Sequence, residues 1–332
     1  MGTPRLSKHL AQEAIDARAA SGNNILAGAR SLGITRGCME ARIRAAELAG
    51  LVPSNMDGAW EQAVRQMPKV APAVDFSREN EHARVGNRVL VIPDVQVKPG
   101  YDQSHLTHVG RYIVSQKPDV VVCIGDFADM ASLSSYDKGK LSFEGRRYVD
   151  DIEAAKAAMS LLLAPMRRYN EENDKQYLPR MVMTLGNHEN RINRAVEDSP
   201  ELFGKLSVGD LGYEEDGWEV YDFLEVVEIF GIEFSHYFTS GVMGRPVSSA
   251  AALLRTRQQS AIMGHTQLCD IALHQKTQQM AMMVGTCYTH DEDYLGPQGN
   301  HARRQVVVLN ECLDGVYDPM LVSLVYLKKR YA

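Results

Sequence analysis

The chain has 332 residues, of which 45% are hydrophobic and 23% charged, the profile of a globular protein with about two domains or one large α/β unit. We find neither an apolar run of the ~20 residues that span a membrane nor a signal peptide, and five scattered cysteines without Cys-x-x-Cys spacing favour a reducing cytoplasm. The net charge of −6 is uneven, because residues 1–52 carry seven Lys/Arg against four Asp/Glu, and the acidic remainder suits a cation site better than general nucleic-acid coating.

Residues 6–20, 25–32 and 36–49 are predicted to be helices, with a turn at Gly33 and an N-cap at Thr35. A helix, a Gly-containing turn and a second helix make a helix-turn-helix, and residues 29–36 resemble this segment of bacterial DNA-binding regulators. The resemblance implies that Thr35, Arg36 and Glu40 contact bases and that Arg42 and Arg44 contact phosphates. The alternative is a three-helix module, spanning 1–52, that only packs or dimerises.

Residues 53–87 contain three prolines and little periodicity, which predicts a linker with a short helix near 60–66. A βαβ unit should follow, with strands at 88–92 and 120–124 around a helix at 104–117. We expect a loop at 130–147, an amphipathic helix at 148–170 and a strand at 181–185. The second half predicts a hairpin of 226–230 with 232–236, a helix at 248–258, and short strands at 261–263, 269–274, 279–286, 304–310 and 319–327.

Polar side chains follow the apolar runs at several predicted strand ends. In chain order they are Asp94 and Gln96, Asp126, Asn187 and His188, His236, and His265 and Gln267. Ligands bind beyond the carboxyl ends of strands in α/β sheets, and Asp, Asn and His supply mixed oxygen and nitrogen ligands for divalent metals. Taken alone, Gly186-Asn187-His188-Glu189 could be an ordinary polar turn.

The order and spacing of these blocks resemble the calcineurin-like metallophosphoesterase superfamily, whose pattern is D-x-H, G-D-x-x-D, G-N-H-E, a lone His and G-H-x-H. The resemblance implies a four-layer α/β/β/α sandwich over residues 88–332 with a binuclear metal site. Asp126 matches the bridging carboxylate, Asp94 a ligand of the first metal, and Asn187, His236 and His265 the other ligands of the second. His188 matches the general acid that lies outside the ligand shell, and Asn187, His188 and Arg191 are expected to contact the substrate phosphate.

Two residues depart from the family pattern, because Gln96 and Gln267 stand where it usually has histidine. Both belong to the first metal, and amide oxygens favour Mn or Mg over Fe or Zn. We therefore expect two divalent ions, with Mn preferred and Mg, Fe, Zn or Ni as alternatives. The site of the first metal could instead be empty. Alternatively, the phosphoesterase domain at 88–332, which we call the body, could have lost its catalytic activity.

The loops at 288–293 and 300–304 are predicted to be solvated, with a contact to substrate or metal as the alternative. The leading hypothesis is a metal-dependent phosphodiesterase or nuclease. Its N-terminal helices, residues 1–52, which we call the head, would bring it to DNA. The alternatives are a phosphomonoesterase on nucleotides or phosphoproteins, and a DNA-binding regulator with an inactive body. A small DNA-binding head on a phosphoesterase resembles proteins of tailed phages, which would place the chain in a host cytoplasm. A homo-oligomer is possible on this evidence, and a membrane partner is not expected.

Overall fold

The computed structural model describes residues 8–49, 51, 53, 86–292, 296 and 299–332. The chain divides into two compact units, 1–81 and 82–332, and each is described by itself. The expected linker at 53–87, with its short helix near 60–66, falls almost entirely outside the described residues, although Asn87 already begins the first strand.

Three helices make up the described part of the first unit: α1 (Lys8–Ala20), α2 (Ile25–Ser31) and α3 (Arg36–Leu48). Asn24 begins α2 by accepting hydrogen bonds from two backbone N–H groups, and Thr35 accepts one from Cys38 N at the start of α3. Between the two helices Gly33 has a φ of +63°, a conformation that glycine adopts without strain. A small apolar core holds the helices together through Ala14, Ala29, Met39 and Ile43. The helices predicted here are confirmed within the described residues.

The second unit contains a six-stranded sheet in the order β13-β12-β1-β2-β3-β4. Its strands are β1 (Asn87–Ile92), β2 (Val120–Cys123), β3 (Arg180–Thr184), β4 (Glu219–Tyr221), β12 (Gln305–Leu313) and β13 (Val316–Ser323). β1 to β4 run parallel, and β12 is antiparallel to both of its neighbours. The predicted βαβ unit is therefore present, with α5 (His105–Gln116) between β1 and β2.

A five-stranded sheet follows in the order β10-β11-β9-β6-β5. Its strands are β5 (Val227–Ile229), β6 (Ile232–Phe234), β9 (Ala261–Met263), β10 (Cys269–Leu273) and β11 (Met280–Val284). β5 and β6 form the expected antiparallel hairpin around Gly231, and β6 pairs with β9 in parallel. A two-stranded ribbon of β7 (Thr239–Ser240) and β8 (Arg245–Pro246) lies outside both sheets.

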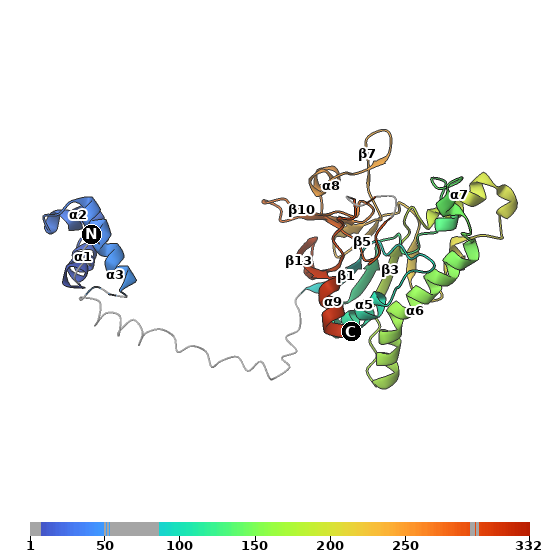
Figure 1. The fold of residues 1–332 in the computed structure, drawn as a ribbon, viewed down its shortest axis with the longest axis horizontal. Helices are drawn as coiled ribbons and strands as arrows, with labels where there is room; N and C mark the ends of the chain where they lie inside the picture. Colours follow the sequence, from blue (N-terminus) through green and yellow to red (C-terminus); the bar gives the residue numbers. More distant parts are fainter. Residues whose placement is uncertain (1–7, 50, 52, 54–85, 293–295, 297–298) are drawn as a thin grey trace. The chain divides into compact units, whose positions relative to one another are not determined.

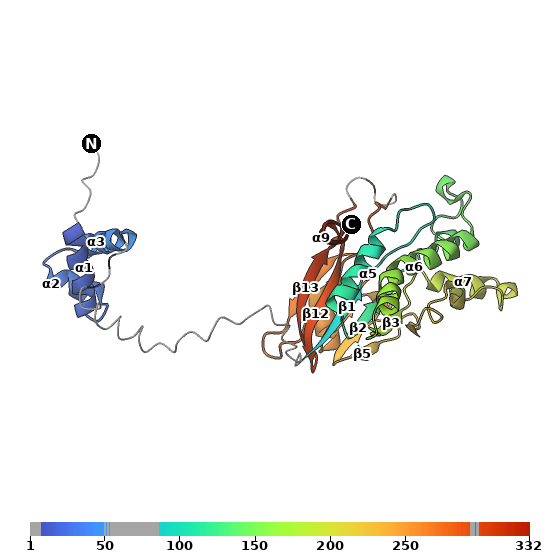
Figure 2. The same cartoon turned by 90° about the horizontal axis from the view of Figure 1, so that it is seen from below.

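Alternating side chains show how the two sheets stack. Leu90 and Ile92 point to a core shared with α5, α6 (Tyr148–Glu172) and α9 (Leu324–Tyr331), whereas Val89 and Val91 point to a core between the sheets. On the second sheet Ile262 joins the inner core, while its neighbours pack with Leu253 of α8 (Ala250–Arg257). Figures 1 and 2 show α5, α6 and α9 on one side of the six-stranded sheet, and Figure 1 shows α8 beside the other sheet. The predicted four-layer α/β/β/α sandwich is confirmed.

The C-terminal segment differs from its prediction. A strand was expected at 319–327, but β13 ends at Ser323 and α9 begins at Leu324. Ser323 caps the helix by accepting a hydrogen bond from Tyr326 N at 3.2 Å, and Leu324 and Leu327, three residues apart, are buried. Basic residues in the last turn complement the helix dipole. The apolar residues of this segment were interpreted as a strand, whereas part of them form a capped helix. The short strand β4 was not predicted either.

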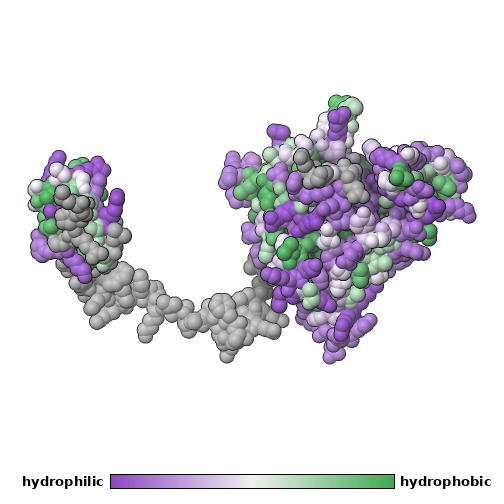
Figure 3. All heavy atoms as spheres, viewed as in Figure 1, coloured by the Kyte–Doolittle hydropathy of each residue, from purple (hydrophilic) through white to green (hydrophobic). Residues whose placement is uncertain are grey.

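Among the described helices, none combines the length and the apolar character that crossing a bilayer requires. On the face of the second unit drawn in Figure 3, hydrophilic residues predominate and hydrophobic ones form scattered patches.

Candidate metal and phosphate site

The polar residues singled out in the sequence come together because the strands that carry them are paired in register. Ile92 is level with Cys123, and Cys123 with Met183, so β1, β2 and β3 end at one edge of the first sheet. In the second sheet Phe234 is level with Ile262, which brings the loops after β6 and β9 together. Asp94, Asp126, Asn187, His236 and His265 all lie in these loops.

Backbone conformations in these loops are unusual. Gln96, Asp126, His265 and Gln267 have φ values of +46°, +50°, +63° and +58°. Side chains other than glycine rarely adopt this region, and such strain concentrates at functional sites where the surrounding structure enforces it. Gly186 is also required, because an added Cβ would lie 2.0 Å from Asp126 Oδ1. Four of the seven predicted metal ligands are therefore held in strained conformations.

Asp126, His236 and His265 form a group that can hold a metal ion, with one ligand atom from each within 4.8 Å of the others. Asn187 Oδ1 joins them, at 3.0 Å from His236 Nε2 and 2.7 Å from His265 Nδ1. His236 donates from Nδ1 to the carbonyl of Ile124 at 2.8 Å, which orients Nε2 toward Asp126 Oδ2, 3.3 Å away. These four side chains are the ligand set predicted for the second metal.

Electrostatics at this group favour a cation. Burial lowers the pKa of His236, but Asp126 outweighs burial and raises it to about 9. Burial raises the pKa of Asp94 to about 7, and its Oδ2 has no hydrogen-bond partner among the residues that the structure describes. A buried carboxylate oxygen without a partner is costly unless a cation compensates it. The donor set and this orphaned oxygen fit a divalent metal.

The residues predicted for the first metal lie around the same point. Asp94 Oδ1 accepts a hydrogen bond from His265 N at 3.1 Å, and Gln96 N donates to the carbonyl of Asp126 at 2.8 Å. Gln96 is buried, and Gln267 Oε1 accepts a hydrogen bond from Tyr288 at 2.9 Å. An amide oxygen has a second lone pair, so this hydrogen bond leaves Gln267 able to act as a ligand.

His188 is paired with a residue that the sequence reasoning did not name as functional. Its Nδ1 lies 2.5 Å from Asp129 Oδ1, its Nε2 lies 3.7 Å from Asp126 Oδ2, and Arg191 reaches the same Nε2 at 3.3 Å. Burial lowers the pKa of His188, but Asp126 and Asp129 raise it further than burial lowers it. The two carboxylates thus favour the protonated imidazole, while the Arg191 guanidinium opposes it. Asp129 is the last residue of the Gly125–Asp129 motif, so the signal that could have found it was present.

Glu189, which the sequence analysis also did not name as functional, links the loop after β2 to the loop after β3. Its buried carboxylate accepts hydrogen bonds from Asp126 N at 3.0 Å, Ala128 N at 2.9 Å and Gly186 N at 2.9 Å. Three backbone donors satisfy a carboxylate that would otherwise be costly to bury. The glutamate of the Gly-Asn-His-Glu block thus holds the backbone of Asp126 and Ala128 against that of Gly186.

A lysine connects the His188–Asp129 pair to a distant loop. Lys98 Nζ lies 3.8 Å from Asp129 Oδ2 and 2.5 Å from Glu292 Oε2. Glu292 is buried, and it also bonds His290 at 2.9 Å. The solvated loop predicted at 288–293 is wrong for Tyr288 and Glu292, which are both buried, Tyr288 stacked on the His290 ring and Glu292 paired with Lys98. Asp293 is not among the described residues.

We expect Lys98→Met to lower kcat about 10-fold without changing metal content, since loss of a supporting partner costs about 10–100-fold in activity. Without the ammonium, Asp129 loses a charge that holds it toward His188. Lys98→Arg should restore part of the rate, and Lys140→Met, which removes an exposed lysine paired with Asp137, is the matched control. The measurement is steady-state turnover with metal analysis, and an unchanged kcat in Lys98→Met would show that Asp129 needs no such support.

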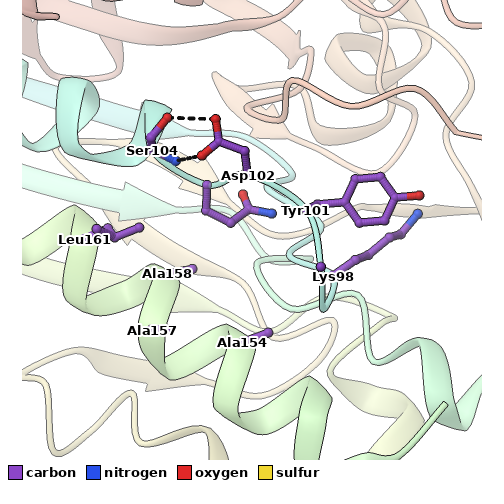
Figure 4. A pocket seen from close by; sticks show the side chains of 10 residues that line it. Lys98, Tyr101, Asp102, Ser104, Ala154, Ala157, Ala158 and Leu161 are labelled. Carbon is purple, nitrogen blue, oxygen red and sulfur yellow. Dashed lines mark hydrogen bonds between the residues drawn. The ribbon is translucent and has the colours of Figure 1, made fainter. Parts of the chain in front are cut away.

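A pocket of about 270 Å³ opens at two of the predicted metal ligands, and we call it the active-site pocket. Besides Asn187 and His265 it is lined by Arg191 and Arg194 of α7 (Asn190–Asp198) and by Tyr136, Phe223 and Tyr237. A second pocket, of about 350 Å³, includes Lys98. In Figure 4 the small side chains Ala154, Ala157 and Ala158 lie along α6, opposite Tyr101 and Lys98. Only the first pocket contains predicted metal ligands.

The predicted DNA-contacting residues occupy two sides of α3. Thr35, Arg36 and Arg44 are exposed, and Arg36 bonds Glu40 at 2.7 Å. Residues 36, 40 and 44 are successive i, i+4 neighbours and share one face. Arg42 lies on another side, with 15% of its side chain exposed and 3.9 Å from Glu13. The structure thus brings three of the candidates onto one face and sets Arg42 apart from them.

The sandwich fold and the Asp, Asn and His cluster at the ends of both sheets define a metal-dependent phosphoester hydrolase. The chain belongs to the calcineurin-like phosphoesterase family, whose family model matches residues 87–268. Enzymes of this family use divalent metal ions.

Two solved structures are similar to the chain at low identity. Wild-type Vps29 from Entamoeba histolytica, complexed with Zn²⁺, is 16% identical with a TM-score of 0.33, covering 71% of this chain and 99% of that one. A second structure is 11% identical with a TM-score of 0.31, covering 72% of this chain and 100% of that one. Similarities this low assign no residue a role. No curated protein sequence matches the chain.

Proposed function

We propose that the protein is a metal-dependent phosphodiesterase, a nuclease acting on DNA, with His188 as general acid. The observation that carries the proposal is the position of His188, which is bound to Asp129 at 2.5 Å and lies 3.7 Å from Asp126 beside the metal-ligand cluster. A proton donor next to such a cluster, but outside it, is what hydrolysis of a phosphoester with a poor leaving group needs.

Each residue of the site has a separate task in this reaction. Two divalent cations, when bound, would supply an activated water and positive charge at the phosphoryl oxygens. Asp129 holds the imidazole of His188 by Nδ1, which leaves Nε2 beside the metal-ligand cluster, 3.7 Å from Asp126 Oδ2, to give its proton to the leaving oxygen. Arg191 lies beside that nitrogen and is anchored by the carbonyl of Asp129 at 2.7 Å, where it can bind a phosphate oxygen.

Activity should require added metal, with Mn²⁺ best, because Asp94, Gln96 and Gln267 would offer oxygen rather than imidazole to the first metal. The test is a matrix of Mn, Mg, Zn and Ni against bis-aryl and mono-aryl phosphates and single- and double-stranded DNA. Equal rates after exhaustive chelation would contradict the two-metal mechanism. Preference for the mono-aryl phosphate would favour a phosphomonoesterase instead.

Gln96 and Gln267 also support a second candidate function, that of a DNA-binding regulator whose phosphoesterase body is inactive. They replace the imidazole ligands that the family usually has at the first metal. The same matrix separates the two readings, because an inactive body would turn over none of the substrates with any metal.

We infer that the first unit is a helix-turn-helix that binds DNA. The turn at Gly33 between α2 and α3, and the exposed Thr35, Arg36 and Arg44, support this inference. Arg42 then serves the fold rather than a phosphate, since it is mostly buried beside Glu13.

Deletion of residues 1–52 should leave turnover of a small aryl diester intact, because every proposed ligand lies after residue 93. The truncated chain should lose affinity for duplex DNA, and Arg36→Ala should reproduce part of that loss. Duplex binding is measured across a salt series, where few phosphate contacts should give a shallow dependence.

The control for this experiment is Arg255→Ala, which removes an exposed arginine of α8 in the second unit. Equal DNA binding by the full and truncated chains would show that the head does not read DNA. Loss of small-substrate turnover on truncation would show that the head belongs to the catalytic fold.

A further inference from the structure

The active-site pocket combines three kinds of side chain that a bare phosphate would not require. The metal ligands Asn187 and His265 line one part of it, and two arginines of α7 line another. Three aromatic residues, Tyr136, Phe223 and Tyr237, also line it. The metal ligands and arginines suit an anion, whereas the aromatic rings suit a flat, uncharged group attached to it.

Two of the three aromatic rings pack against each other, and one of them packs against a predicted metal ligand. The Tyr237 ring lies 4.6 Å from the His265 ring and meets the Phe223 ring edge-on at 5.5 Å. Tyr237 and Phe223 are half-buried, while Tyr136 is 81% exposed. Rings fixed in this way present a π-face at little entropic cost, which is how proteins bind bases of single-stranded nucleic acids.

The two arginines differ in how far they are already engaged. Arg191 donates to the carbonyls of Asp129 and Met130 and reaches His188, so it belongs to the catalytic group. Arg194, three residues on and therefore on the same face of the helix, is exposed, and within the described part of the chain its guanidinium has one hydrogen bond, to the carbonyl of Asn187 at 3.1 Å. A guanidinium has five donors, so Arg194 can bind a phosphate oxygen.

We propose that the active-site pocket recognises a nucleotide, with its base stacked on Tyr237 and a phosphate oxygen bound by Arg194. This proposal rests on the proposed function and deepens it, because it assigns the base and a phosphate oxygen of the substrate to Tyr237 and Arg194. A phosphorylated peptide offers no obligatory flat group, so the paired rings of Tyr237 and Phe223 favour the nucleotide.

The test uses two diesters with the same leaving group, thymidine 5′-(p-nitrophenyl) phosphate and methyl p-nitrophenyl phosphate. With the metal-loaded full chain, kcat/KM should be at least about fivefold higher for the thymidine ester, the lower end of what one base–aromatic stack contributes. Tyr237→Ala should bring this ratio close to one, and Tyr237→Phe should keep it, because stacking needs the ring and not the hydroxyl. Tyr326→Ala, which removes an exposed tyrosine of α9 outside the pocket, should also keep it.

Binding is measured independently of turnover, by calorimetry of thymidine 5′-monophosphate and of 2-deoxyribose 5-phosphate, which differ only in the base. The monophosphate should bind at least about fivefold more tightly, and Arg194→Ala should weaken both ligands. If both esters react with equal kcat/KM, or if Tyr237→Ala leaves the ratio of the two kcat/KM values unchanged, the nucleotide pocket is overturned. The proposed phosphodiesterase activity is then still supported. If neither ester reacts with any metal, the proposed function fails, and equal binding of the two ligands would then overturn the pocket as well.

Discussion

Asp126→Asn is expected to remove metal and activity together. In the proposed site one carboxylate serves both ions, and loss of one partner from a buried charged pair costs about 3–5 kcal/mol, which corresponds to about 10²–10⁴-fold in binding or rate. Asparagine keeps an oxygen that can accept the hydrogen bond from His188 N, now 2.9 Å long, so the loop should survive. The measurements are metal content by elemental analysis and turnover of an aryl diester.

The control for this variant is Asp137→Asn, which removes a carboxylate paired with Lys140 and Arg146 outside the site. It should retain both metal and rate. Two metal ions per chain in Asp126→Asn would exclude a bridging role for this residue, and thermal unfolding of each variant shows whether a loss comes from misfolding.

His188→Ala should lower turnover by about 10²–10⁴-fold, the usual contribution of a general acid, while metal content stays nearly intact. The imidazole lies beside the ligand cluster and is bound to Asp129 at 2.5 Å, so its removal takes away a proton and not a ligand. Substrates with good leaving groups need no proton, so the variant should lose less turnover on them. The measurement is kcat across aryl diesters of increasing leaving-group pKa.

Asp129→Asn provides the matched comparison, because it keeps the shape of the partner of His188 but removes the charge that favours the imidazolium. Turnover in Asp129→Asn should depend on the leaving group in the same way, but it should fall less than in His188→Ala. If His188→Ala loses metal instead of rate, His188 is a ligand, and the assignment of the acid has to be revised.

Most of the secondary structure and most residues of the candidate site could be predicted from the sequence, because both predictions depend on neighbours along the chain. Apolar runs of strand length, each followed by Asp, Asn or His, placed Asp94, Asp126 and Asn187 at strand ends, and parallel pairing makes such ends meet. The C-terminal helix was misread because Leu324 and Leu327 lie in an apolar run that suits a strand as well as a helix, and only packing against α5 and the cap by Ser323 decides between them.

Only the tertiary structure decided the contacts between side chains far apart in the sequence. Lys98 and Glu292 are separated by 194 positions, and no local pattern links them. Tyr237, Phe223 and Arg194 likewise belong to three different segments, and they line one pocket only because the loops after β3, β4 and β6 meet at one edge of the sandwich. The sequence by itself therefore determined the chemistry of the predicted metal ligands, since residue type and strand position carry it. Packing determined which groups contact His188 and which side chains line the pocket beside the predicted ligands, because burial and distance arise only when the two sheets close on each other.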